Sequence, residues 1–330
     1  MTRPPPPTKD PLHLPELGFG AAAIARREIG ARTAHDCVGR AWDLGIRYFD
    51  TAPMYGSGVS ERRLGEALAH HPRSQYVLST KVGRLVRPGH PDSRGTGRDW
   101  VFDFGADAVR TSVRESLHRL GTRHIDLLYL HDPDDHWHEA VTAAWPALAE
   151  LRDQGLVRAV GVGMNQAAML TEFVQHATPD VVLMAGQYSL LDTTALDELL
   201  PACLRRGVRV VVAQALHGGL IDGVPDASFH YRPVDSATRD TARRIAEVCH
   251  GHGVPTAAAA IQFPLGHPAV TTVLTGPRTP GQTRQNAALM RRPLPPELWH
   301  DLTTAGLLRE DAPIPATSGT LPAPQEDHPR

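Results

Sequence analysis

The chain has 330 residues, a formal net charge of −2 and 41% apolar residues. This length suits one large α/β barrel or two ordinary domains, and the apolar content is enough for a sizeable core. The near-neutral balance, with acidic and basic residues scattered, excludes an electrostatic footprint for nucleic acid or an anionic membrane, so neither is expected as a partner.

The two ends of the chain differ from its middle. Residues 1–11 are rich in proline and lack the apolar run of an export signal, and residues 316–330 are similarly polar. Both are predicted to be disordered tails, which leaves one barrel domain at residues 12–315. No apolar stretch approaches ~20 residues, so no membrane span is expected.

Short apolar, β-branched runs alternate with longer helical patterns along the chain. Eight strands are predicted, at residues 17–20, 46–50, 76–81, 125–130, 157–163, 181–187, 208–214 and 271–276. The stretches between them carry apolar residues at three- and four-residue spacing, the period of a helix. Gly121, Gly155 and Gly207 stand where helix C-terminal caps belong, and residues 254–263 predict a further helix before the eighth strand.

Strands that alternate with helices predict a parallel sheet, which is either open or closed. An open, doubly wound sheet usually carries G-x-G-x-x-G after its first strand. Here Gly18 and Gly20 are followed by Ala23, and the next segment is a weak helix. The preferred fold is therefore a (β/α)8 TIM barrel.

Four polar side chains stand at the ends of three consecutive predicted strands, where barrel enzymes build their sites. Asp50 ends the second strand and Tyr55 lies in the turn after it, Lys81 ends the third, and His131 follows the fourth. Each residue alone has an ordinary explanation in a turn, in packing or at the surface. Since all four fall at consecutive strand ends, we expect them to share one mouth of the barrel.

The chemistry of this set is coherent. A free phenol has a pKa of about 10, and a nearby Lys81 ammonium is expected to lower the pKa of Tyr55. Asp50 is expected to hold Lys81 in place, and His131 to bond a substrate oxygen or complete a proton path. Tyr55 would then act as a general acid or base. Because no strong nucleophile is present, hydride transfer is favoured over acyl transfer.

Two other groups of residues have weaker signals. Residues 131–138, HDPDDHWH, match no common zinc spacing, so no metal site is expected there. Cys37, Cys203 and Cys249 have no C-x-x-C spacing and are predicted to be small buried or half-buried residues in a reducing cytoplasm.

Three blocks resemble the signature motifs of the aldo-keto reductases: residues 49–68 (FDTAPMYGSGVSERRLGEAL), 78–84 (LSTKVGR) and 125–134 (IDLLYLHDPD). The resemblance covers roughly residues 14 to 312. It implies a (β/α)8 barrel that uses NADP(H) or NAD(H). It also implies that Asp50, Tyr55, Lys81 and His131 form a catalytic tetrad. In this tetrad, Tyr55 is the proton donor.

A finer resemblance points to the branch of D-threo-aldose 1-dehydrogenase, L-fucose dehydrogenase and pyridoxal 4-dehydrogenase. It rests on residues 160–166 (VGVGMNQ), 257–270 (AAAAIQFPLGHPAV) and 306–315 (GLLREDAPIP). Members of this branch oxidise a cyclic hemiacetal to a lactone, so a small-molecule carbonyl or sugar is the implied substrate. A tailoring ketoreductase for a larger natural product, and a cofactor-binding sensor or partner subunit, remain alternatives.

The resemblance also implies cofactor contacts. Asn165 and Gln187 match residues that meet the nicotinamide carboxamide. Backbone N–H groups at Gly218 and Gly219 can approach a pyrophosphate. The adenosine end would be held by Gly276, Arg278, Gln282, Gln285 and Asn286. Arg278 could pair with a 2′-phosphate, which makes NADP(H) plausible without excluding NAD(H).

The sequence departs from the family pattern at two places near the cofactor. Met164 stands where a serine commonly precedes the asparagine, and the loop after the seventh strand has no aromatic residue to stack on the nicotinamide. His217 occupies a position where the branch often has asparagine. In the loop after the third strand, Trp100, Phe102 and Phe104 either line the substrate pocket or pack in the core.

Overall fold

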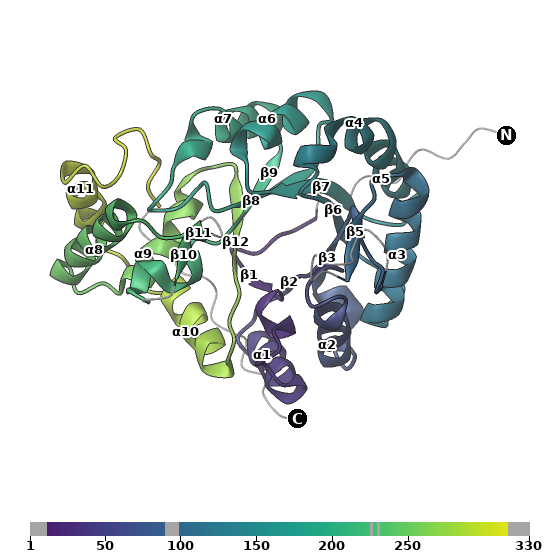
Figure 1. The fold of residues 1–330 in the computed structure, drawn as a ribbon. Coiled ribbons are helices and arrows are strands. Elements are labelled where there is room, and N and C mark those ends of the chain that lie inside the picture. Colours follow the sequence, from purple (N-terminus) through teal and green to yellow (C-terminus); the bar gives the residue numbers. More distant parts are fainter. Residues whose placement is uncertain (1–11, 90–98, 225–226, 230–231, 316–330) are drawn as a thin grey trace.

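Eight parallel strands close on themselves at the centre of the structure (Figure 1). The computed structural model describes residues 12–89, 99–224, 227–229 and 232–315. The predicted (β/α)8 TIM barrel is confirmed, because β1 pairs in parallel with both β12 and β2 and thereby closes the sheet. The barrel strands are β1 (Leu17–Gly20), β2 (Tyr48–Asp50), β3 (Val77–Val82), β6 (Leu127–His131), β7 (Ala159–Met164), β8 (Val181–Ala185), β9 (Arg209–Ala213) and β12 (Val270–Thr275).

Two small antiparallel hairpins lie outside the barrel sheet. One pairs β4 (Arg84–Val86) with β5 (Trp100–Phe102) directly after β3, and the other pairs β10 (Ser228–Phe229) with β11 (Arg232–Pro233) after β9. The sequence did not predict either hairpin, because each strand has only two or three residues and shows no clear alternation.

Helices surround the barrel, as Figure 1 shows. They are α1 (Ala31–Asp43), α2 (Val59–Leu68), α3 (Ala106–Leu120), α4 (Trp137–Glu139), α5 (Trp145–Asp153), α6 (Ala167–His176), α7 (Leu199–Arg206), α8 (Ser236–Gly251), α9 (Thr256–Gln262), α10 (Pro280–Met290) and α11 (Pro296–Thr304). A π-helical stretch at Ala140–Ala144 joins α4 to α5. Short 3₁₀ turns lie at η1 (Ala23–Ala25), η2 (Arg73–Gln75), η4 (Asp134–His136), η6 (Thr194–Leu196), η7 (His217–Asp222) and η8 (Phe263–Gly266).

The predicted helix ends are largely confirmed. Gly121 and Gly207 cap α3 and α7 in the left-handed conformation. Gly155 has φ +74° and follows the C-cap of α5, which is Gln154. The helix predicted at residues 254–263 is present as α9 and continues into the 3₁₀ turn η8, where Pro264 interrupts the α-helical hydrogen bonding.

All eight predicted strands are present, but some of their ends differ from the prediction. Strand β8 ends at Ala185, because Gly186 takes φ +97° and turns the chain out of the sheet. Strand β9 ends at Ala213, because Gln214 takes φ +63°. Strand β6 runs one residue further than predicted, to His131. Backbone φ angles of this kind leave little trace in an apolar pattern.

Two large apolar clusters form most of the core, and a small third cluster includes Leu220 and Ala242. Inside the barrel, the rings of Tyr48 and Tyr129 pack with aliphatic side chains from the surrounding strands, and Leu12 and Leu14 belong to the same cluster. A larger cluster lies between the strands and the helices. In α1, for example, Cys37 and other residues of one helical face are completely buried. The barrel is therefore filled by side chains, and its chemistry must take place at an end.

The surface and the chain ends give less specific information. No helix among the described residues is long and apolar enough to cross a membrane.

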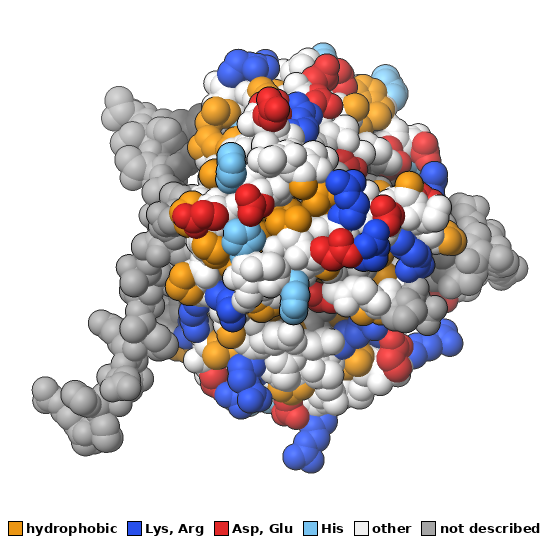
Figure 2. Space-filling model, turned by 90° about the vertical axis from the view of Figure 1, so that its left-hand side faces the viewer, with side chains coloured by type: hydrophobic (Ala, Val, Ile, Leu, Met, Phe, Trp, Pro, Cys, Tyr) orange, Lys and Arg blue, Asp and Glu red, His pale blue; other side chains and the backbone are white. Residues whose placement is uncertain are grey.

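All three cysteines are free and buried, as predicted. On the face that carries α8 and α11, acidic and basic side chains are interspersed (Figure 2). The tails expected at residues 1–11 and 316–330 lie outside the described residues.

Candidate active site

Asp50 and Lys81 form a buried ion pair at the C-terminal ends of β2 and β3. Lys81 Nζ donates hydrogen bonds to Asp50 Oδ2 at 2.6 Å and to the Thr51 carbonyl at 2.9 Å. Asp50 and Lys81 are 3% and 2% exposed, respectively. Burial alone would lower the pKa of Lys81, but Asp50 and then Tyr55 raise it above its usual value. The lysine is therefore an ammonium ion at neutral pH.

The carboxylate of Asp50 is held from its other side by Ser79, which sequence reasoning missed. Ser79 Oγ donates to Asp50 Oδ1 at 2.7 Å and lies 3.1 Å from the Tyr48 hydroxyl, which is 3.2 Å from the Tyr129 hydroxyl. Strand alternation is the signal that could have found it. Residues two apart on one strand share a face, so Ser79 points inward with Lys81.

The loop that carries Tyr55 runs between β2 and α2 and is anchored at its end. Ser60 Oγ donates to the Ala21 carbonyl at 2.8 Å and accepts a bond from Thr51 Oγ1 at 2.8 Å. These bonds fix the start of α2 against the end of β1. They explain locally why the loop holds Tyr55 over the end of the barrel rather than away from it.

Tyr55 faces both Lys81 and His131. The rings of Tyr55 and His131 meet edge to face, with centroids 5.9 Å apart and an interplanar angle of 87°. Lys81 Nζ lies 5.1 Å from the centre of the Tyr55 ring. The structure thus brings together all four residues that the strand ends predict.

One expectation about Tyr55 is wrong. The sequence suggested that Lys81 would lower the pKa of the phenol below its usual value. Lys81 does act in that direction, but burial of the ring is the larger effect, and the net pKa is raised above 10. Tyr55 is therefore a protonated phenol at neutral pH, which is the form of a proton donor.

His131 is buried, with 7% of its surface exposed. Burial is the main cause that holds the pKa of His131 well below 6.5, and the positive charges of Arg84 and Lys81 add to it. The imidazole is therefore neutral at neutral pH. Its Nδ1 atom has no hydrogen-bond partner among the described residues, and its Nε2 atom lies 3.7 Å from Asp132 Oδ2. A neutral imidazole can donate one hydrogen bond to a substrate oxygen.

The three aromatic residues predicted after the third strand have different environments. Phe104 is completely buried and packs against Gly83, whose φ is +100°. A Cβ atom at Gly83 would lie 2.3 Å from the Phe104 ring, so this pair is a packing contact. Trp100 is 9% exposed and Phe102 is 38% exposed, and their rings meet at 5.2 Å in the β4–β5 hairpin.

The amide side chains expected to meet the nicotinamide follow neighbouring strands. Asn165 comes directly after β7 and is half-buried, and Gln187 lies two residues after β8. Gln187 Oε1 accepts a hydrogen bond from the Ala167 N–H at 2.6 Å. This bond orients the Gln187 carboxamide and links its loop to the start of α6, which follows the Asn165 loop.

The loop after β9 contains a buried contact that sequence reasoning did not foresee. Gly218 and Gly219 have φ angles of +65° and +96° inside η7. His217 Nε2 lies 2.8 Å from Ser189 Oγ, and the Phe229 ring packs on the imidazole with centroids 4.7 Å apart. Phe229 belongs to β10, so an aromatic ring does reach this loop from a separate segment.

The residues expected at the adenosine end lie around the start of α10. Arg278 and Gln282 are exposed, and Gln282 Oε1 accepts from the Arg278 N–H at 2.7 Å. Thr279 Oγ1 caps the helix by accepting from the Gln282 N–H at 3.1 Å. Gly276 and Gln285 are exposed, whereas Asn286 is 9% exposed.

The side chains and backbone groups of these loops fit a nicotinamide dinucleotide. Amide side chains suit a carboxamide, glycine backbone suits a pyrophosphate, and a helix start with an exposed guanidinium suits a phosphorylated or free ribose. All of them follow the C-terminal ends of barrel strands, and the four candidate catalytic residues lie at or just after the same ends. Among the described residues, no group of three or more potential ligands could hold a metal ion.

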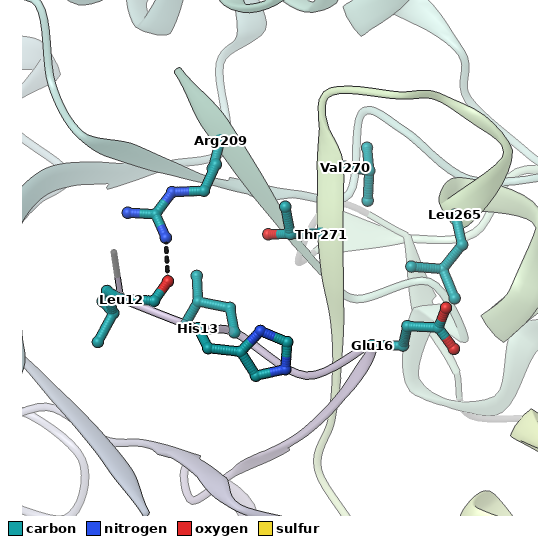
Figure 3. A pocket seen from close by; sticks show the side chains of 8 residues that line it. Leu12, His13, Glu16, Arg209, Leu265, Val270 and Thr271 are labelled. Carbon is teal, nitrogen blue, oxygen red and sulfur yellow. Dashed lines mark hydrogen bonds between the residues drawn. The ribbon is translucent and has the colours of Figure 1, made fainter. Parts of the chain in front are cut away.

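A separate hollow lies at the opposite end of the barrel (Figure 3). Its volume is about 490 Å³, and its lining includes His13, Glu16 and Thr271. Arg209 donates a hydrogen bond to the Leu12 carbonyl at its edge. Because barrel enzymes place their chemistry at the C-terminal ends of the strands, this hollow has no part in the site described above.

The fold and these side chains define a class of protein: a barrel enzyme with a buried lysine–carboxylate pair beside a tyrosine at the C-terminal ends of its strands. A model of the aldo/keto reductase family matches residues 16–306. The chain belongs to the aldo/keto reductase family, and it is an NAD(P)-dependent oxidoreductase.

Individual relatives give the same result. The chain is 40% identical over 317 residues to D-threo-aldose 1-dehydrogenase of Pseudomonas sp, covering 90% of this chain and 95% of the relative. It is 35% identical over 327 residues to pyridoxal 4-dehydrogenase of Microbacterium luteolum, with the same coverage. An aldo-keto reductase from Bacillus halodurans, solved in its holo form, superposes with a TM-score of 0.72 at 27% identity and covers 88% of this chain and 91% of that chain.

Proposed function

We propose that this protein oxidises the hemiacetal carbon of an aldose to a lactone, with Tyr55 exchanging the proton. The observation that carries the proposal is the buried Asp50–Lys81 pair beside Tyr55, with His131 in contact with the phenol ring. The choice of an aldose rests on the 40% identity with D-threo-aldose 1-dehydrogenase. A pyridoxal-like aldehyde is a second candidate because of the 35% identity with pyridoxal 4-dehydrogenase.

Each of the four residues has a role in moving or holding a proton. In oxidation, Tyr55 must first lose its own proton so that the phenolate can accept the hydroxyl proton of the substrate. The Lys81 ammonium stabilises that phenolate, and Asp50 holds Lys81 at the phenol. In reduction, the protonated phenol donates to the carbonyl oxygen. His131, being neutral, donates a hydrogen bond that orients the same oxygen.

The chain's own groups would also bind the cofactor. A bound nicotinamide cofactor accepts or supplies the hydride. Asn165 and Gln187 would hold its carboxamide, the backbone at Gly218 and Gly219 would approach its pyrophosphate, and the segment from Gly276 to Asn286 would hold its adenosine end. The exposed Arg278 favours a 2′-phosphate at this end, so the proposal is that NADP(H) binds more tightly than NAD(H).

The β4–β5 hairpin is proposed as one wall of the substrate pocket. Phe102 is the one aromatic side chain among the large apolar residues exposed in the described part of the chain. Its ring meets the Trp100 ring edge to face, with centroids 5.2 Å apart, and stacks on the Phe104 ring, with centroids 6.2 Å apart. An exposed aromatic face beside a polar site suits the apolar face of a sugar or a pyridine ring. Since Phe104 is buried beneath it, we keep only Phe102 and Trp100 as substrate contacts.

The test is a substrate panel with the purified full-length protein. NAD⁺ and NADP⁺ are each assayed with L-fucose, other aldoses and pyridoxal, and the reverse reaction is assayed with a set of aldehydes and ketones. We expect aldose-dependent formation of reduced cofactor. Turnover confined to bulky ketones would contradict the aldose proposal, and tight cofactor binding without any turnover would indicate a sensor or a partner subunit instead.

A further inference from the structure

Arg84 connects two of the loops that carry the candidate catalytic residues. It is the first residue of β4, which is separated from the third barrel strand by Gly83 alone. Its Nη1 atom lies 2.8 Å from Met54 Sδ, in the loop that carries Tyr55. Its Nη2 atom forms an ion pair with Asp132, the residue that follows His131. One guanidinium thus contacts the segments after β2 and β6.

The surroundings of this ion pair exclude much of the solvent. The guanidinium carbon lies 4.7 Å from the centre of the Trp100 ring and 5.0 Å from the centre of the Phe102 ring. The side chains of Arg84 and Asp132 are 12% and 21% exposed. Because both partners are largely shielded and the guanidinium stacks on aromatic rings, salt would screen the pair less than it screens a surface pair.

Asp132 is held in an unusual place. Its backbone φ is +44°, and its N–H donates to the Gly163 carbonyl at 3.0 Å. This conformation brings Asp132 Oδ2 to 3.7 Å from His131 Nε2. A carboxylate without a cation at that distance would favour the protonated imidazole, because opposite charges within 4–6 Å stabilise each other. A protonated His131 would alter how the site binds a neutral oxygen.

Several other groups act on the same imidazole. The charged and titratable groups that contact the imidazole or act on its pKa are Tyr55, Lys81, Arg84 and Asp132, from β3, β4 and the loops after β2 and β6. Behind them, Asp50 pairs with Lys81 and Asp134 acts on Asp132. Burial, then Arg84 and then Lys81 hold the pKa of His131 well below its usual value. Arg84 therefore acts twice, as a cation near His131 and as the partner of Asp132.

We propose that Arg84 is a positioning residue: its ion pair with Asp132 screens His131 from that carboxylate and ties the loops of Tyr55 and His131 together. The kinetic consequences of this inference rest on the function proposed above. The effect of this ion pair on the pKa of His131 does not depend on any reaction.

The test is an NMR titration of the imidazole nitrogens in the full-length protein, with His131 assigned from the spectrum of His131→Gln. In Arg84→Gln, we expect the apparent pKa of His131 to rise by about one unit or more, because a cation is lost and Asp132 is no longer paired. In Arg84→Gln/Asp132→Asn, most of that rise should disappear. The matched control is Arg87→Gln. It removes another guanidinium next to β4, but one that donates to Glu115, with Nη1 and Oε1 3.0 Å apart.

The outcomes distinguish a role of Arg84 in screening His131 from a purely structural role. An unchanged His131 titration in Arg84→Gln overturns the proposal, as does a rise that persists in full after Asp132→Asn is added. If Arg84→Gln does not fold, Arg84→Lys takes its place. It keeps a cation without the paired geometry, so the apparent pKa of His131 should rise by less than about one unit. An unchanged pKa in Arg84→Lys also overturns the proposal. Where turnover is found, the acidic limb of the kcat/KM profile should move up with the NMR value.

Discussion

Replacing Lys81 with methionine tests the buried ion pair and the proton chemistry together. The substitution keeps the length of the side chain and removes two hydrogen bonds, to Asp50 Oδ2 at 2.6 Å and to the Thr51 carbonyl at 2.9 Å. It also leaves the Asp50 carboxylate buried, with the Ser79 hydroxyl still bonded to its other oxygen. Breaking a buried pair by removing one partner typically destabilises a protein by about 3–5 kcal/mol.

Both side chains are almost completely buried, so solvent and salt screen the pair little. By itself this would place the loss of stability in the upper part of that range. The Ser79 bond offsets part of the loss, so we expect about 3 kcal/mol less free energy of unfolding for Lys81→Met at pH 7. Adding Asp50→Asn removes the stranded charge. The double variant should recover at least about 1 kcal/mol relative to Lys81→Met alone.

The same substitution should affect the reaction. Lys81 is the largest contribution that lowers the pKa of Tyr55, against the burial that raises it. Without the ammonium, that pKa rises further, and less phenolate forms at a given pH. Each unit of pKa corresponds to a tenfold change in the phenolate fraction, so oxidation at pH 8 should fall by about tenfold or more.

Urea unfolding followed by circular dichroism measures the loss of stability in Lys81→Met. Initial rates of cofactor reduction between pH 6 and 10 measure the effect on the reaction. Lys81→Met with a free energy of unfolding within about 1 kcal/mol of the wild type would refute the stability argument. An unchanged alkaline limb would refute the assigned effect of Lys81 on Tyr55.

Three further predictions concern stability and cofactor choice. Burial would raise the pKa of Asp126, but hydrogen bonds and Arg73 lower it to about 2. The Asp126 carboxylate should therefore stabilise the fold by about 2 kcal/mol above pH 5, and this contribution should disappear as the pH falls toward 2. Asp126→Asn should therefore lower the free energy of unfolding at pH 7 and flatten its dependence on acid, as urea titrations at several pH values would show. Gly83→Ala places a Cβ atom 2.3 Å from the Phe104 ring at φ +100°, so we expect a loss of about 2 kcal/mol or more in the same assay. Arg278→Ala should weaken NADP⁺ binding about tenfold while leaving NAD⁺ nearly unchanged, as fluorescence titration can measure; equal effects on both cofactors would contradict the 2′-phosphate role.

The barrel was predictable from the sequence because its strands are short, buried on both faces and separated by amphipathic helices. The four residues at the strand ends were predictable for the same reason, since parallel strands deliver their ends to one rim. Asp50 and Lys81 meet because β2 and β3 are adjacent and in register, with Asp50 opposite Ser79. Local sequence and topology together fix that contact.

Other features depend on contacts between distant segments or on backbone angles. The Arg84–Asp132 ion pair joins residues 48 apart, and the contact of His217 with Phe229 requires a two-residue strand. The net pKa of Tyr55 depended on how deeply the ring is buried, which the motif does not specify. Phe104 and Phe102 are two residues apart, yet only the packed structure shows that one lies in the core and the other at the surface.

The central claim is that Tyr55 exchanges the proton while the surrounding residues keep it poised. The most direct measurement compares wild type and Tyr55→Phe for turnover of L-fucose or the best aldose of the panel, alongside the dissociation constant of the cofactor. We expect a loss of turnover of about 100-fold or more with cofactor affinity retained. Turnover by Tyr55→Phe within a few fold of the wild type would contradict the assigned role of Tyr55.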